Sequence, residues 1–145
     1  MVRNILFKDA QALESICTSS LGHKTTAGLI MQRIRELSNN SCYYMAVYED
    51  DATHQVLGFI QAERYSPLYD DNGWNVIALA VLTEARNQGI GKQLLASLEK
   101  LVARENDAFI RLNCNTIRTE AHEFYQHMGY RCDKTQKRFI KTFNR

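Results

Sequence analysis

The hydrophobic and polar positions along the chain follow both helical and strand periods, which predicts an α/β fold. The clearest helical stripe lies in residues 90–102, where apolar residues recur every three or four positions. The clearest strand is residues 74–82 (WNVIALAVL), an almost unbroken apolar run typical of a strand buried on both faces. Residues 109–115 alternate between apolar and polar side chains, and we expect them to return as a parallel neighbour of that strand through a right-handed crossover.

Shorter elements of both kinds fill the rest of the chain. Helices are predicted after Asp9, which occupies an N-cap position, after Thr25, and over residues 119–129. Strands are predicted for residues 2–8, 42–49 and 56–65, and for two strands or a hairpin within 130–143. We therefore expect a mixed sheet of about six to seven strands with about four helices on its two faces, in a single domain spanning residues 1–145.

Composition agrees with one globular domain and excludes several classes of protein. The 145 residues are 45% hydrophobic and 23% charged, with a formal net charge of +2. The basic residues are spread along the chain, which gives no footprint for nucleic acid. No apolar run reaches the roughly 20 residues that cross a bilayer. The first residues carry charges where a secretion signal needs an apolar run, so we expect a cytoplasmic protein without membrane contact.

The four cysteines predict neither a disulfide nor a metal site. Cys17, Cys42, Cys114 and Cys132 lie far apart in the sequence, without a CxxC pair or a histidine at ligand spacing. Each falls in an apolar or strand-like context, so we expect buried, reduced thiols.

The segment ARNQGIGK, residues 85–92, connects the apolar strand to the long helix and is the best candidate for chemistry. Gly89 and Gly91 lack a Cβ, so the backbone can bend there and approach a ligand closely. The first N–H groups of the following helix have no internal partners, and the helix dipole favours an anion at that end. A diphosphate fits such a site, with Arg86 and Lys92 adding positive charge.

Two familiar phosphate-binding loops do not match this spacing. A P-loop needs glycine at position 86 and serine or threonine at 93, but the chain has Arg86 and Gln93. A dinucleotide fingerprint needs a third glycine at 94, where Leu94 stands. Two glycines alone are equally consistent with an ordinary start of a helix.

Two motifs together resolve this ambiguity through a family resemblance. Arg86, Gly89 and Gly91 match the pattern [Q/R]-x-x-G-x-[G/A], and residues 121–130 (AHEFYQHMGY) match A-x-x-x-Y-x-x-x-G-[F/Y]. With this separation and this order of elements, the chain resembles a small, single-domain, bacterial-type member of the GNAT N-acetyltransferase superfamily.

The resemblance implies a splayed sheet and a bound co-substrate, acetyl-coenzyme A, without a metal ion. Strand 74–82 is expected to diverge from strand 109–115, which leaves main-chain groups without partners. The amide-bearing pantetheine arm of coenzyme A is then expected to pair with Leu79, Ala80 and Val81 as a strand would.

The resemblance also assigns the pyrophosphate to the glycine loop. The expected ligands are the Arg86 side chain and consecutive main-chain N–H groups, those of Gln88, Gly89, Ile90, Gly91 and Lys92. Family members often have asparagine three residues before the alanine of the second motif, where this chain has Arg118. Arg118 or Asn115 is the candidate to replace that contact.

By the same resemblance Tyr125 is the general acid, which protonates or hydrogen-bonds the sulfur of coenzyme A as it leaves. The motifs assign no general base, because the position where some relatives place a glutamate is Asn75. Glu63 ranks first among the remaining carboxylates because it lies at the end of a strand that faces the expected cleft. The other candidates are His23, Asp70 and Asp71.

The function predicted is transfer of an acetyl group to a primary amine by direct attack in a ternary complex. The segment that begins at Arg118 resembles small members acting on low-molecular-weight amines, which favours a small-molecule acceptor. The alternatives are a protein or peptide amine acetyltransferase and a non-catalytic acyl-coenzyme A sensor. Aromatic residues are candidates to line an acceptor slot, namely Tyr43, Tyr65, Tyr69 and Trp74. Dimers are common among similar proteins, although the sequence marks no interface.

Overall fold

A computed structural model describes residues 1–144 of the chain. The chain divides into two compact units, Met1–Asn113 and Cys114–Arg145. The first unit contains the whole β-sheet and the first three α-helices, and the second contains the last α-helix.

The first unit is built on a five-stranded mixed sheet, in the order β1-β2-β3-β4-β5. The strands are β1 (Val2–Asn4), β2 (Tyr43–Glu49), β3 (Val56–Tyr65), β4 (Gly73–Val81) and β5 (Phe109–Arg111). β1 to β4 pair antiparallel, and β5 pairs parallel to β4. The predicted α/β class and parallel return are confirmed, while the strand count is lower than the six to seven expected.

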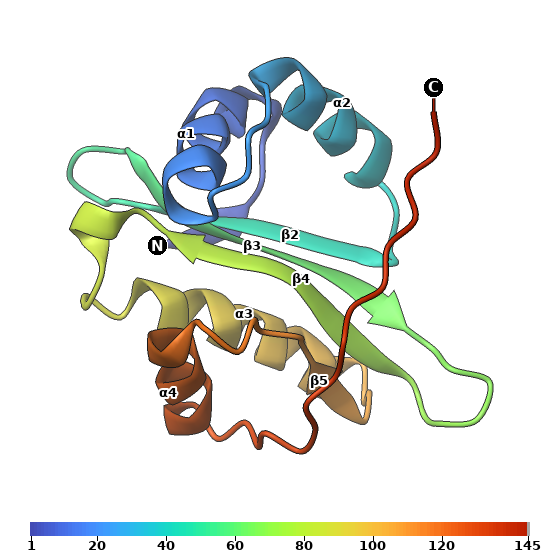
Figure 1. Ribbon diagram of the computed structural model, residues 1–145. Coiled ribbons are helices and arrows are strands. Elements are labelled where there is room, and N and C mark those ends of the chain that lie inside the picture. The colour runs from blue at the N-terminus through green and yellow to red at the C-terminus, as the bar shows by residue number, and fades with distance from the viewer. Residues whose placement is uncertain (145) are drawn as a thin grey trace. The chain divides into compact units, whose positions relative to one another are not determined.

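Helices cover both faces of this sheet. α1 (Ala10–Ser20) and α2 (Ala27–Leu37) lie on one face, and α3 (Ile90–Arg104) lies on the other (Figure 1). Two short 3₁₀ turns, η1 (Phe7–Asp9) and η2 (Thr83–Ala85), precede α1 and α3. The stripe predicted for α3 is its core face, and its fully buried members are Leu94, Leu95 and Leu98.

The pairing between β4 and β5 stops early. Only three residue pairs join the two strands, and the last is Asn75 with Arg111. Two residues further along, β4 carries a β-bulge. Ala62 of β3 pairs with Val76 and its neighbour Gln61 pairs with Ala78, so Ile77 of β4 is left without a partner on β3. β5 itself ends at Arg111, so the bulge lies just beyond the last residue pair between the two strands, and a bulge increases the local twist of its strand. The prediction that 74–82 is buried on both faces is wrong at the bulge, where Ile77 is 45% exposed.

The second unit contains α4 (Thr119–His127) followed by an extended segment. Within the described part of that segment, residues 130–144, no residue belongs to a strand, so the predicted C-terminal strands are wrong. Phe139 and Phe143 are 89% and 76% exposed. Alternating apolar residues predict an extended backbone, but a strand also needs a partner for its main-chain groups, which alternation does not specify.

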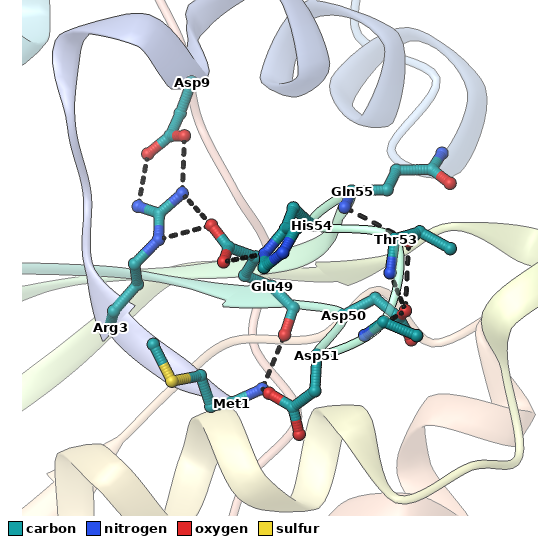
Figure 2. Close-up of polar contacts among 10 residues, drawn as sticks. Met1, Arg3, Asp9, Glu49, Asp50, Asp51, Thr53, His54 and Gln55 are labelled. Carbon is teal, nitrogen blue, oxygen red and sulfur yellow. Dashed lines mark hydrogen bonds and ion pairs between the residues drawn. The ribbon is translucent and has the colours of Figure 1, made fainter.

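A buried ion pair fixes the N-terminus of the first unit (Figure 2). The Arg3 guanidinium donates two hydrogen bonds of 2.9 Å to Asp9, whose side chain is 3% exposed, and another to Glu49. The Asp9 carboxylate also accepts from the Leu6 N–H at 2.7 Å. Asp9 holds the predicted N-cap position of α1 but forms no side-chain cap, and its carboxylate bonds to this network instead. These contacts raise the pKa of Arg3 above its usual range.

We expect Asp9→Asn to lower the free energy of unfolding by about 3 kcal/mol, because breaking a buried ion pair leaves the positive charge of Arg3 with less compensation by negative charge. Chemical denaturation monitored by circular dichroism measures this change. Glu36→Gln is the matched control, since it removes a carboxylate whose partner Arg33 is exposed. Equal stability losses in the two variants would contradict the role given to Asp9.

Candidate active site

The edge of β4 beyond Asn75 has no strand partner among residues 1–144. The Leu82 N–H donates to the Leu57 carbonyl of β3. The Ala80 carbonyl also faces β3, since its oxygen lies 2.9 Å from the point where a Cβ would stand if Gly58 had a side chain. Main-chain groups alternate in direction along a strand, so those of Leu79 and Val81 point to the unpaired edge. An extended molecule with amide groups can pair with this edge as an additional strand does.

The unpaired edge leads directly, through η2, into the glycine loop. Gly89 has φ +78° and occupies the N-cap of α3, a left-handed conformation that glycine adopts without strain. Because glycine has no side chain, it offers no side-chain cap to the helix, and its carbonyl accepts from the Gln93 N–H at 3.0 Å. Within residues 1–144 the main-chain N–H groups of Ile90, Gly91 and Lys92 have no acceptor. They form a set of donors for an anion at the positive end of the helix dipole.

Two positively charged residues, Arg86 and Lys92, lie close to these donors along the chain. Arg86, Gln88 and Lys92 are exposed, and neither Arg86 nor Lys92 forms an ion pair within the described chain. The strand edge and the loop follow each other along the chain, and together they offer unpaired main-chain groups and positive charge to a molecule with an amide-bearing arm and a diphosphate.

A row of polar side chains crosses the sheet where β4 and β5 still pair. Register aligns Tyr43, Glu63, Asn75 and Arg111 on four adjacent strands. The Asn75 amide joins the two charged members: its Nδ2 donates to Glu63 Oε2 at 2.8 Å, and its Oδ1 accepts from Arg111 at 2.7 Å. Asn75 therefore separates a carboxylate from a guanidinium while bonding to both.

This polar row lies on the face of the sheet that α1 and α2 cover in part. A Cβ at Gly58 would meet Ile90 and Leu94 of α3, so even-numbered residues of β3 face α3. Glu63 and Tyr65 are odd-numbered and face the other side. A shallow cavity of about 400 Å³, broadly open to solvent, lies beside them and is lined by Glu63, Arg64, Tyr65, Ser66, Pro67 and Tyr69.

The other predicted acceptor residues are distributed differently. Trp74 is 1% exposed and donates to Asp107 at 2.8 Å, so it belongs to the core beside α3 and not to a slot. Asp70 and Asp71 are exposed residues of the loop between β3 and β4 and do not line the cavity. His23 is exposed in the connection between α1 and α2.

Arg111 is a functional candidate that the sequence reasoning missed. Its guanidinium bonds to the amide oxygens of Asn75 and Asn113 and lies 4.9 Å from the centre of the Tyr65 ring. The available signal was a charged residue between Ile110 and Leu112 in a pattern otherwise read as a core strand. The register that places it beside Asn75 comes only from the structure.

Tyr125 lies on α4 in the second unit. Its ring is half-buried and makes edge contacts with Phe124 and Tyr130, with centroids 5.1 and 6.0 Å apart. Burial raises the pKa of the Tyr125 phenol to about 12, with a further rise from Cys114 and an opposing effect of Arg118. Within residues 1–144 its hydroxyl forms no hydrogen bond and is available to a ligand.

The two candidates for an additional coenzyme contact also belong to the second unit. Arg118 is exposed at the N-cap of α4. Asn115 is exposed, its Oδ1 accepts from the Ile117 N–H at 3.2 Å, and its side chain carries no charge. Arg118 therefore offers more to an anion than Asn115 does.

The cysteines are all unpaired, but the prediction that all four are buried is wrong. Cys42 and Cys132 are exposed, because both lie in segments outside the strands. Burial raises the pKa of the Cys17 thiol, which keeps it protonated. Residues 1–144 contain no group of three His, Cys, Asp or Glu side chains placed to bind a metal ion. No helix in the same range is long and apolar enough to cross a membrane.

The chain is similar in sequence to known proteins over most of its length. Residues 39–132 match the family model described as an acetyltransferase (GNAT) domain. The uncharacterized N-acetyltransferase MJ1530 of Methanocaldococcus jannaschii is 30% identical over 148 residues, which cover 97% of this chain and 84% of the relative.

Solved structures share the fold at low sequence identity. A protein described as a transcriptional regulator from Bacillus halodurans aligns with a TM-score of 0.86 at 15% identity, over 97% of this chain and 99% of that one. The aminoglycoside 6'-N-acetyltransferase AAC(6')-IG of Acinetobacter haemolyticus aligns with a TM-score of 0.79 at 11% identity, over 99% of both chains.

Proposed function

Because the chain belongs to the GNAT acetyltransferase family, we propose that it transfers the acetyl group of acetyl-coenzyme A to a primary amine of a small molecule, by direct attack in a ternary complex. We assign residues 1–145 to one N-acetyltransferase domain, since the family match over 39–132 runs across the boundary between the two units.

The observation that carries the proposal is the unpaired edge of β4 next to the unsatisfied donors of α3. Leu79 and Val81 offer main-chain groups to the amides of the pantetheine arm. The N–H groups at the start of α3, with Arg86 and Lys92, match the charge of the pyrophosphate. Acetyl-coenzyme A itself supplies an activated thioester, so the protein needs to orient it and to manage two protons.

The first proton is that of the acceptor amine. An alkylamine has a pKa near 10.4, so removing its proton at pH 7 costs about 4.6 kcal/mol. We assign Glu63 as the base, because it lines the cavity and its Oε1 has no protein partner in the described chain. Asn75 holds the other oxygen and thereby orients the carboxylate.

The second proton belongs to Tyr125, whose phenol hydroxyl is assigned to the departing sulfur. A thiol has a pKa near 8.5, so complete proton transfer from a phenol of pKa about 12 is uphill by about 3.5 units. A hydrogen bond that stabilises the thiolate is therefore favoured over full transfer.

The test is calorimetric titration with acetyl-coenzyme A, followed by assay of free thiol with polyamines, amino acids, aminoglycosides and peptides. Binding in the micromolar range and thiol release with small amines are expected. A folded protein with no affinity for acetyl-coenzyme A would refute the proposal. Binding without turnover on any amine would support the sensor alternative, and preference for peptides would support a protein acceptor.

We expect Glu63→Gln to lower kcat/KM for the best amine by about a hundredfold at pH 7, the lower end of the range for general base catalysis. Because substrates already deprotonated need no base, the deficit should shrink as the pH approaches 10. A pH series of initial rates measures it. A deficit that stays constant with pH would assign Glu63 to binding instead of proton removal.

A further inference from the structure

Building on the proposed function, we propose that the acceptor amine also carries a carboxylate, and that Arg111 binds this group. Arg111 is half-buried on the face of the sheet where Glu63 and Tyr65 border the cavity. The site would therefore select zwitterionic amines, such as amino acids, over simple amines.

The charge of Arg111 is compensated differently from that of the other shielded arginines. Arg3 bonds to two carboxylates, and Arg64 bonds to Asp107 at 3.1 Å. Within residues 1–144 no carboxylate lies within 4 Å of the Arg111 guanidinium. Its protein partners are two neutral amide oxygens and an aromatic ring. A partly desolvated charge without a counter-ion is costly, and an anionic ligand removes that cost.

Donor geometry also favours a carboxylate. Two of the five N–H groups of Arg111 are used, one by Asn75 and one by Asn113. The remaining donors belong to a planar fork, which matches the two oxygens of a carboxylate. The Tyr65 ring 4.9 Å away restricts the orientation of the fork.

Asn75 explains why Arg111 and Glu63 remain available to a ligand. The two residues lie two strands apart, which places their backbones about 10 Å from each other. The intervening amide satisfies one oxygen of Glu63 and one N–H of Arg111 and prevents a direct ion pair. One end of the row therefore offers a carboxylate to the ammonium group, and the other offers a guanidinium to the carboxylate of the same molecule.

The experiment compares amino acids with their carboxamides, which differ only in the anionic group. Suitable pairs are β-alanine with β-alaninamide and 4-aminobutanoate with 4-aminobutanamide. For the natural protein, kcat/KM and calorimetric affinity are expected to favour the amino acid at least tenfold in one pair. In Arg111→Gln, which keeps a donor for Asn75 but loses the charge, this ratio should fall to about one. Arg33→Gln, on an exposed surface of α2, should keep the ratio of the natural protein.

The possible outcomes separate the inference from the function on which it rests. Acetylation of simple amines without preference for the carboxylate would overturn the inference and leave the acetyltransferase intact. Amino acid binding that depends on Arg111 but occurs without turnover would support the site and refute the enzyme. A rise in the Kd for acetyl-coenzyme A in Arg111→Gln, with an unchanged amine ratio, would assign Arg111 to the coenzyme and overturn the inference.

Discussion

Tyr125→Phe is expected to lower kcat about a hundredfold while changing the KM for acetyl-coenzyme A less than threefold. The variant removes one hydroxyl and keeps the ring contacts with Phe124 and Tyr130. A hydrogen bond to a charged group contributes about 1.5–3 kcal/mol, which corresponds to roughly tenfold to over a hundredfold in rate when it forms only in the transition state. Steady-state thiol release with a saturating amine measures this loss.

The pH dependence of the same reaction checks the protonation state of Tyr125. With a pKa of about 12, the phenol remains protonated and able to donate up to about pH 11. The rate of the natural protein should therefore rise with pH as the amine and the general base deprotonate, and it should not fall near pH 10. A fall near pH 10 that is absent in Tyr125→Phe would mean that the phenol loses its proton there. Tyr48→Phe in β2 removes the same hydroxyl elsewhere and should leave kcat within twofold. Equal rates in the natural protein and Tyr125→Phe would remove Tyr125 from the mechanism.

Gly89→Asp is expected to raise the Kd for acetyl-coenzyme A about a hundredfold relative to Gly89→Asn. Both side chains project into open space, since no atom lies within 4 Å of a Cβ at this position. Both also bear the same cost of about 1 kcal/mol or more for a φ of +78°. They differ in charge, and a carboxylate beside a diphosphate is repelled by about 3 kcal/mol at an effective dielectric constant near 20.

This pair of variants separates electrostatics from backbone geometry. A negative charge at the N-cap stabilises a helix, so Gly89→Asp should unfold at a temperature equal to or above that of Gly89→Asn. Calorimetric titration gives both Kd values, and added salt should narrow the difference between them. Equal affinities in the two variants would mean that the diphosphate does not lie at the start of α3.

Sequence alone identified the elements whose periodicity is strong and local. The stripe of α3, the boundaries of β3 and the glycine loop follow from side-chain spacing and from the conformational freedom of glycine. The two motifs around Gly89 and Tyr125 also led to the family. Such features depend on residues close together in the chain, which is why the pattern is sufficient.

The tertiary structure alone decided where strands pair and where pairing stops. Alternation in residues 130–143 indicated strands, yet no residue of the described segment 130–144 forms one, because a ladder needs a partner that a local pattern does not name. The pairing of β4 with β5 ends at Asn75, just before the bulge at Ile77, and the register of three strands joins Glu63, Asn75 and Arg111. These residues are far apart in sequence, and their proximity arises from long-range hydrogen bonding, so only the folded sheet reveals the polar row beside the cavity.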